Sequence, residues 1–289
     1  MVGFGTYPIP DDEVAGIVKT ALEVGYRHVD TAEVYRNEAG VGAGIRAGMD
    51  ELGLSREEVF VTTKAFPVSG EGARSGAEII HACEGSLERL GLDHVDLYLI
   101  HSPFAGPGRV EQWQALMELK DRGLAMHIGV SNFSEAHIRE LLDAGLPKPE
   151  ADQIELHPWS QRPELVSYLT QNSIAPIAYS SLAPMSTWRT GPGDWSSKTD
   201  AMRTDGGQTD ATFKAMAEKY GVTEAQVMLR WGLQKGFTVL PKSTHPDRIR
   251  SNFDLYSFEI DAGDMTAIEA MDRGVGGWAW QGGDPLNLP

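Results

Sequence analysis

Short apolar runs alternate with stretches of helical periodicity along most of the chain, and this alternation constrains the fold more than any other feature. Each run is rich in β-branched and aliphatic residues and too short for a typical helix, so it is predicted to be a strand. The eight predicted strands cover residues 2–7, 28–30, 59–64, 95–101, 126–130, 152–156, 174–179 and 237–241. Strands that alternate with helices form parallel sheets. The prediction is a closed (β/α)8 TIM barrel, with a doubly wound open sheet as the alternative.

The 289 residues are assigned to a single domain, residues 1–289, because no linker rich in Pro, Gly or Ser divides them and no internal repeat is evident. Residues 183–209 break the alternation, since they are rich in Gly, Ser, Thr and Asp and show no sustained period. Loops of this length are usually functional or disordered. We expect residues 183–209 to form a long loop, and residues 272–289 a C-terminal tail, over the face that carries the active site.

The charge balance limits the partners of the protein. With 25 basic and 41 acidic residues the net charge is −16, and there is no basic run, which argues against a nucleic-acid or anionic membrane surface. The single cysteine, Cys83, is expected to be a buried and unreactive thiol. The sequence shows neither a secretory signal nor an apolar run long enough to span a bilayer. We expect a cytoplasmic protein, and take a monomer as the working expectation.

Three consecutive predicted strands end on polar residues, which are Asp30, Lys64 and His101. Each residue alone has an ordinary structural explanation, as a helix cap, a solvated lysine or a hydrogen-bonded histidine. In a barrel, however, the carboxyl ends of all strands meet at one rim. We therefore expect a carboxylate, an ammonium and an imidazole to lie together at that rim.

Tyr35 lies five residues after Asp30 and adds a phenol at the same rim. Its ordinary pKa is near 10, but a neighbouring ammonium would stabilise the phenolate and make proton donation easier. Lys64 is placed to do this, Asp30 to hold the ammonium, and His101 to orient a polarised carbonyl oxygen. The set suits carbonyl reduction better than hydrolysis, because no nucleophile is paired with a base and no spacing is typical of a metal site.

Five short motifs follow one another along the chain: G-F-G-T-Y, G-Y-R-H-V-D-T-A-E-V-Y-x-N-E-x-x-V-G, D-L-Y-L-I-H-S-P, I-G-V-S-N-F and P-K-S-T-H-P-D-R-I-R-S-N. Each is weak alone, but the ordered set resembles the aldo-keto reductase superfamily from Gly3 to about Met271. The resemblance implies a barrel that binds a nicotinamide dinucleotide extended across its mouth, without the Gly-rich Rossmann fingerprint. It also implies that the N-terminal hairpin that closes the barrel bottom in relatives is missing here.

The resemblance assigns roles to single residues. It implies that Tyr35 is the general acid, that Lys64 and Asp30 lower its pKa, and that His101 is the orienting group. The cofactor contacts that it implies are Ser131, Asn132, Gln153, Tyr179, Ser180 and Leu182. The first three hold the carboxamide, the tyrosine stacks on the nicotinamide ring, and the last two contact the pyrophosphate region. Amide side chains can pair with both the donor and the acceptor of a carboxamide, and an aromatic face suits a flat ring.

A second polar cluster follows the last strand and consists of Lys242, Ser243, Thr244 and Arg248. An ammonium, two hydroxyls, a guanidinium and a helix N-terminus suit a phosphate monoester, although a solvated helix start is the ordinary alternative. The resemblance implies that this cluster binds the 2′-phosphate of NADP and that Asn252 faces the adenine. Ser251 stands where many relatives carry an acid that also contacts adenine, so weaker affinity or preference for NADP is expected.

The substrate pocket is less well defined by the sequence. By the resemblance, Tyr7, Phe66 and Ser102 line it, and Ser102 replaces a large aromatic residue, which leaves a roomier or more polar wall. Four tryptophans of the loop and the tail would frame the pocket or pack those segments down: Trp188, Trp195, Trp278 and Trp280. The substrate is left open among sugars, keto acids, methylglyoxal-like aldehydes and lipid aldehydes.

The expected function is reduction of aldehydes or ketones to alcohols with NADPH, of the alcohol dehydrogenase or carbonyl reductase type, with NADH as an alternative donor. A nicotinamide-binding sensor or regulatory subunit with little turnover is a second hypothesis, which the complete Asp-Tyr-Lys-His set disfavours. A third is a phosphate-binding barrel isomerase or lyase. It would use the basic cluster but leaves Tyr35 without a role.

Overall fold

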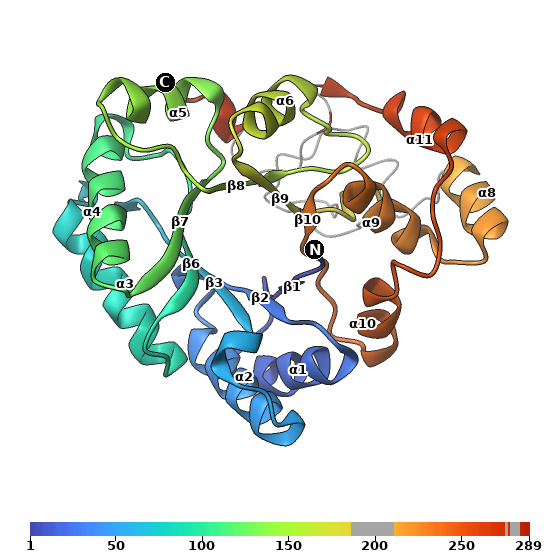
Figure 1. The fold of residues 1–289 in the computed structure, drawn as a ribbon, viewed down its shortest axis with the longest axis horizontal. Coiled ribbons are helices and arrows are strands. Elements are labelled where there is room, and N and C mark those ends of the chain that lie inside the picture. The colour runs from blue at the N-terminus through green and yellow to red at the C-terminus, as the bar shows by residue number, and fades with distance from the viewer. Residues whose placement is uncertain (186–210, 275–276, 278–283) are drawn as a thin grey trace.

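The computed structural model of the chain describes residues 1–185, 211–274, 277 and 284–289. Its main sheet has eight strands in the order β1-β2-β3-β6-β7-β8-β9-β10, and all neighbours are parallel. A parallel bridge between Val2 and Val239 joins the first strand to the last, so the sheet closes. Figure 1 shows the ring of strands with the helices around its outside. The predicted (β/α)8 barrel is confirmed, and the open sheet is wrong.

The element bounds follow the sequence pattern closely. The barrel strands are β1 (Phe4–Gly5), β2 (His28–Asp30), β3 (Phe60–Ala65), β6 (Val95–Ile100), β7 (Ala125–Ser131), β8 (Ala151–Glu155), β9 (Ala175–Tyr179) and β10 (Thr238–Val239). The described helices are α1 (Asp11–Val24), α2 (Glu38–Leu52), α3 (Gly76–Leu90), α4 (Arg109–Asp121), α5 (Glu135–Asp143), α6 (Pro163–Gln171), α8 (Ala211–Tyr220), α9 (Glu224–Gln234), α10 (Pro246–Phe253) and α11 (Ala262–Glu269).

Local signals set the ends of these helices. Ser75 begins α3 by accepting the backbone N–H of Glu78 in a capping box, and Gly91 ends it with a left-handed φ of 64°. Helix α2 approaches its neighbours closely, because a Cβ atom at Gly42 would overlap the carbonyl of Leu90 in α3. This packing fixes the start of α2, which follows directly on the segment that carries Tyr35.

An apolar layer fills the inside of the barrel, formed by Leu97, Leu99, Ala151, Ile177 and Leu240. Side chains alternate along a strand, so each next inward position toward the carboxyl end lies just above this layer. Those positions are His101 after β6, Gln153 on β8 and Tyr179 on β9. The barrel geometry therefore places a polar layer directly on an apolar floor at the carboxyl rim.

Several short elements escape the sequence prediction, and two of them lie close to Tyr35 and Phe66. Glu33–Tyr35 forms a 3-10 turn, and Val68–Ser69 (β4) pairs antiparallel with Gly72–Ala73 (β5) in a hairpin after β3. The predicted loop begins with a 3-10 turn at Ala183–Met185, and its continuation lies outside the described residues. Of the predicted tail, residues 284–289 are described and contain a 3-10 turn at Pro285–Asn287.

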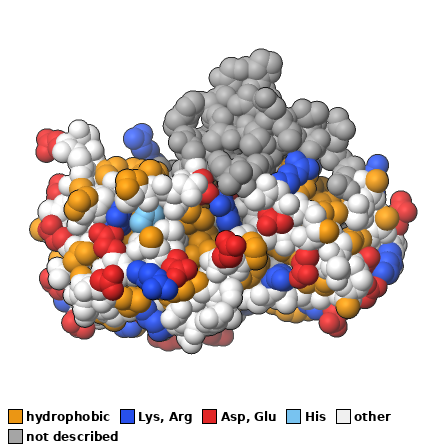
Figure 2. Space-filling model, turned by 90° about the horizontal axis from the view of Figure 1, so that it is seen from above, with side chains coloured by type: hydrophobic (Ala, Val, Ile, Leu, Met, Phe, Trp, Pro, Cys, Tyr) orange, Lys and Arg blue, Asp and Glu red, His pale blue; other side chains and the backbone are white. Residues whose placement is uncertain are grey.

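Charged side chains of both signs lie on the surface, as expected from 25 basic and 41 acidic residues. Figure 2 shows acidic and basic side chains interspersed over the side of the barrel that carries α5 and α6. No helix in the described part of the chain is long and apolar enough to cross a membrane. Cys83 is buried on α3 as predicted, and burial raises the pKa of its thiol to about 12, which disfavours the reactive thiolate.

Candidate active site at the carboxyl rim of the barrel

Lys64 is completely buried near the end of β3 and is the centre of the polar layer. Its Nζ atom donates to Asp30 Oδ1 at 2.6 Å and to the carbonyl of Thr31 at 2.7 Å. A longer contact of 3.4 Å joins Nζ to the hydroxyl of Tyr35. A buried ammonium needs such partners, because an unpaired charge would be strongly destabilising there. The contacts bring together the carboxylate, the ammonium and the phenol that the sequence predicts.

Tyr35 ends the 3-10 turn, and Arg36 follows it with a left-handed φ of 56°. Asn37 then holds this turn to the loop that carries Tyr7, since its Nδ2 atom donates to the carbonyls of Thr6 at 3.1 Å and Ile9 at 2.9 Å. The sequence analysis missed this role, although Asn37 belongs to one of the motifs noted there. Its place in that motif, two residues after Tyr35, is the signal that could have indicated it.

Burial raises the pKa of Tyr35 well above its ordinary value, and Coulomb interactions with Asp30 and with the hydroxyl of Tyr7 add to the effect. Burial also lowers the pKa of Lys64, while Asp30 opposes that change. The sequence analysis expected a lowered pKa for Tyr35, and this expectation is wrong for the structure as it stands. The physical reason is that burial disfavours the charged phenolate, while the ammonium of Lys64 lies closer to Asp30 and Thr31 than to the phenol.

His101 follows β6 and is 7% exposed. Burial and the nearby charge of Lys64 hold the pKa of His101 well below its ordinary value, so the imidazole is neutral at physiological pH. Its ring lies edge-on to Tyr35, with 5.6 Å between ring centres. Its Nδ1 atom has no hydrogen-bond partner within the described residues. A neutral imidazole beside a protonated phenol can donate a hydrogen bond to a carbonyl oxygen.

A chain of hydrogen bonds leads from the Lys64 pair across the rim. Gln153 Nε2 donates to Asp30 Oδ2 at 2.7 Å, and the carbonyl of Gln153 accepts from Ser131 Oγ at 2.7 Å. Asn132 Nδ2 donates to Ser131 Oγ at 3.0 Å, and Asn132 Oδ1 accepts from the hydroxyl of Tyr179 at 2.6 Å. The four residues predicted to hold the nicotinamide therefore form one connected group with Asp30.

The other predicted residues lie around this group. Ser180, which has a left-handed φ of 54°, is exposed directly after β9, and Leu182 is half-buried beyond it. Tyr7 packs against Tyr35 with ring centres 4.8 Å apart. Ser102 is fully buried, and its Oγ atom has no hydrogen-bond partner in the described ranges. The four tryptophans expected to frame the pocket, Trp188, Trp195, Trp278 and Trp280, lie outside the described residues.

Phe66 completes an aromatic wall that the sequence analysis named only in part. Its ring lies 5.9 Å from that of His101 and 6.0 Å from that of Phe104, and both pairs are edge-to-face. Phe104 follows the strand-end motif by one residue, and its position three residues after His101 is the signal that could have found it. The wall offers a face for an aromatic or aliphatic group next to the polar layer.

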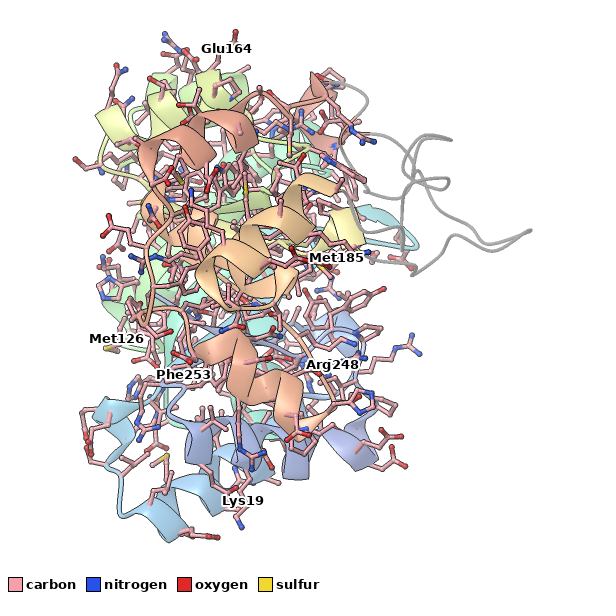
Figure 3. All side chains as sticks on the ribbon, turned by 90° about the vertical axis from the view of Figure 1, so that its right-hand side faces the viewer. Lys19, Met126, Glu164, Met185, Arg248 and Phe253 are labelled. Atoms are coloured by element: carbon pink, nitrogen blue, oxygen red, sulfur yellow. The ribbon has the colours of Figure 1, made fainter. Side chains whose placement is uncertain are left out.

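The second predicted cluster runs from the segment after β10 into α10, which contains Arg248. Ser243 is buried, and its Oγ atom accepts the backbone N–H of His245 at 3.1 Å, while Lys242, Thr244 and Arg248 are exposed. Neither Lys242 nor Arg248 forms an ion pair with another described residue. Figure 3 shows Arg248 on α10 toward the side of the barrel where Met185 lies. Asn252 is buried one helical turn beyond Arg248.

The chain is similar in sequence and fold to known proteins. A family model described as the aldo/keto reductase family matches residues 1–273. The chain belongs to the aldo/keto reductase family. An oxidoreductase of Bacillus subtilis is 38% identical over 276 residues, which cover 94% of this chain and 89% of that protein. The methylglyoxal reductase of Escherichia coli is 35% identical, with 94% and 90% covered.

Solved structures of the family agree in fold. An aldo-keto reductase of Bombyx mori in complex with NADP is 34% identical and superimposes with a TM-score of 0.81, covering 94% of this chain and 89% of that one. An aldo/keto reductase from Brucella melitensis is 36% identical with a TM-score of 0.79, covering 94% of both chains. The chain is therefore an aldo/keto reductase family barrel, and its oxidoreductase relatives disfavour the hypothesis of an isomerase or lyase.

Proposed function

We propose that the protein reduces aldehydes or ketones to alcohols with NADPH. The observation that carries the proposal is the placement of Tyr35 between Lys64 and the neutral His101, above the apolar floor of the barrel. A protonated phenol and a neutral imidazole are hydrogen-bond donors, which a carbonyl oxygen needs as it becomes an alcohol. The relatives support the same class, since one is named a methylglyoxal reductase and another is solved with NADP.

In the proposed reaction, NADPH supplies the hydride that reaches the carbonyl carbon. Tyr35 donates its proton to the carbonyl oxygen, and His101 orients that oxygen through a hydrogen bond. The ammonium of Lys64 then stabilises the phenolate that remains on Tyr35. Asp30 holds Lys64 in place, so it acts on the reaction through the ammonium.

The residues at the rim fit a nicotinamide dinucleotide. Asn132 and Gln153 carry amides that match a carboxamide, Ser131 adds a hydroxyl, and Tyr179 offers an aromatic face. Ser180 and Leu182 lie on the segment after β9 and would contact the pyrophosphate. These six residues would hold the reactive half of the cofactor.

The cluster at the start of α10 would hold the other half of the cofactor. Lys242 and Arg248 are basic side chains without an ion-pair partner among the described residues of a chain whose net charge is −16. With Ser243 and Thr244 they would bind the 2′-phosphate, and Asn252 would face the adenine. NADH would lack the phosphate contacts and bind more weakly.

A turnover assay together with a binding assay tests the proposal. Purified protein is mixed with NADPH and a panel of small aldehydes and ketones, and the absorbance of the reduced nicotinamide is followed. NADPH binding is measured separately by calorimetry. Oxidation of NADPH that depends on the carbonyl is the expected result. Tight binding of NADPH with no turnover on any carbonyl would favour the sensor, and no binding would contradict both.

A further inference from the structure

Glu33 lies on the same turn as Tyr35 and connects that turn to the loop that carries Phe66. Its Oε1 atom accepts the backbone N–H of Phe66 at 2.9 Å and Nη1 of Arg74 at 2.6 Å. Only 11% of the Glu33 side chain is exposed. Hydrogen bonds to a carboxylate are stronger than those between neutral groups, and partial burial strengthens them further. Glu33 is thus a firm link between the proton donor and the aromatic wall.

A second anchor holds the far side of the same loop. Gln112 is fully buried on α4, and its Nε2 atom donates to the carbonyls of Pro67 and Arg74, each at 2.8 Å. The backbone N–H of Arg74 donates to the carbonyl of Pro67 at 2.9 Å, which closes the β4–β5 hairpin. Gln112 therefore fixes the hairpin to α4. The side chain of Glu33 joins this hairpin to the turn that ends in Tyr35.

The position of Phe66 matters because its ring contacts are edge-to-face. The ring lies 5.9 Å from His101 at an angle of 84° and 6.0 Å from Phe104 at 76°. The energy of such pairs depends on the distance and angle between the rings. A small displacement of the Phe66 backbone would change the shape of the wall beside His101, while the contacts of Lys64 with Asp30 and Tyr35 would stay in place.

We propose that Glu33 is a positioning residue that sets substrate selectivity. By holding the Phe66 N–H and Arg74, it keeps the aromatic wall at a fixed distance from Tyr35, so that an aldehyde with an aromatic or similarly bulky group packs on Phe66 while its oxygen meets Tyr35. A small aliphatic aldehyde does not reach the wall and does not depend on Glu33. This inference rests on the reductase activity proposed above.

The test compares Glu33→Ala and Glu33→Gln with the unsubstituted chain, using benzaldehyde and propanal with NADPH. Glu33→Ala removes both contacts, so the KM for benzaldehyde should rise about tenfold with kcat little changed, as expected when one aromatic contact is lost. For propanal, kcat and KM should both stay within about twofold. Glu33→Gln keeps an oxygen acceptor for the Phe66 N–H and should restore most of the benzaldehyde KM. The Kd for NADPH should be unchanged throughout.

The outcomes separate the possible failures. An equal loss of kcat/KM on both aldehydes, a loss in kcat alone, or no change in Glu33→Ala would overturn the role of Glu33 while leaving the reductase intact. If Glu33→Ala does not fold, Arg74→Met takes its place. It removes the cation partner and should raise the ratio of the benzaldehyde KM to the propanal KM about threefold; an unchanged ratio overturns the inference. No turnover by the unsubstituted chain would defeat the proposed function and this inference together.

Discussion

The Nζ atom of Lys64 lies 3.4 Å from the hydroxyl oxygen of Tyr35 but only 2.6 Å from Oδ1 of Asp30. The ammonium is therefore bound chiefly by the carboxylate, and it also lies 5.0 Å from the centre of the Tyr35 ring. In this state the phenol keeps its proton, because burial and Asp30 both raise its pKa. Lys64 would act when the proton leaves, by stabilising the phenolate as it forms.

Removing the charge of Asp30 should lower the free energy of unfolding. Asp30→Asn leaves the fully buried ammonium of Lys64 without its anion, and breaking one side of a buried pair typically costs about 3–5 kcal/mol of unfolding free energy. Urea denaturation followed by circular dichroism measures this loss. The double variant Asp30→Asn/Lys64→Met should lose less than the sum of the two single losses, since no charge is left unpaired. Additive losses would contradict the coupling.

At high pH, kcat/KM for carbonyl reduction should fall because Lys64 loses its proton. The pKa of Tyr35 is raised, so its proton is retained well beyond neutral pH, whereas the pKa of Lys64 is lowered by burial. As pH rises through the lowered pKa, the ammonium is lost and kcat/KM for reduction should fall. In Lys64→Arg the fall should move to higher pH, because guanidinium stays protonated. A fall at the same pH in both proteins would point to Tyr35 instead.

Acid should destabilise the fold through buried histidines. Burial lowers the pKa of His28 to about 4, while its Nε2 atom lies 2.9 Å from Thr62 Oγ1. The unfolded residue takes up its proton near pH 6.5, so the stabilisation is complete above that pH and falls as the pH drops toward 4, by about 3 kcal/mol. Urea unfolding at pH 7 and pH 4.5 measures the change. His28→Gln should show a smaller difference between the two pH values; an identical difference would exclude His28 as the source.

The preference for NADPH should depend on Arg248. Losing a charged contact to the 2′-phosphate costs about 1.5–3 kcal/mol, so Arg248→Ala should raise the NADPH Kd by roughly 10- to 100-fold. The NADH Kd should hardly change. Arg250→Ala is the matched control, because Arg250 lies on the same helix but pairs with Asp247 at 3.1 Å. Equal effects of Arg248→Ala on both cofactors would refute the phosphate site.

The barrel and its rim are largely predictable because they depend on short periodic signals. A strand alternates its side chains, so the apolar run that ends on His101 places that residue one step above the apolar layer, and the ends of β2 and β3 bring Asp30 and Lys64 to the same rim. Eight strands alternating with helices predict a closed barrel, and the bridge between Val2 and Val239 closes it. These predictions use only the order of nearby residues in the sequence and the general geometry of a barrel.

The rest of the site depends on contacts between distant segments, which periodicity does not report. Glu33, on the turn after β2, forms an ion pair with Arg74, which follows the β4–β5 hairpin. Asn37 donates a hydrogen bond to the carbonyl of Ile9 in the loop before α1. The predicted direction of the Tyr35 pKa shift is wrong for the same reason. Its direction is set by burial and by how closely Lys64 approaches each partner, and neither can be read from the order of residues.

The most direct measurement compares Tyr35→Phe with the unsubstituted chain, using NADPH and the aldehyde that the unsubstituted chain reduces fastest. The substitution removes only the hydroxyl, so NADPH should bind with an unchanged Kd. Carbonyl-dependent oxidation of NADPH should fall by at least about 10²-fold, the usual contribution of a general acid. Retention of most of the turnover in a folded, NADPH-binding Tyr35→Phe would contradict the account, because another group would then be the proton donor.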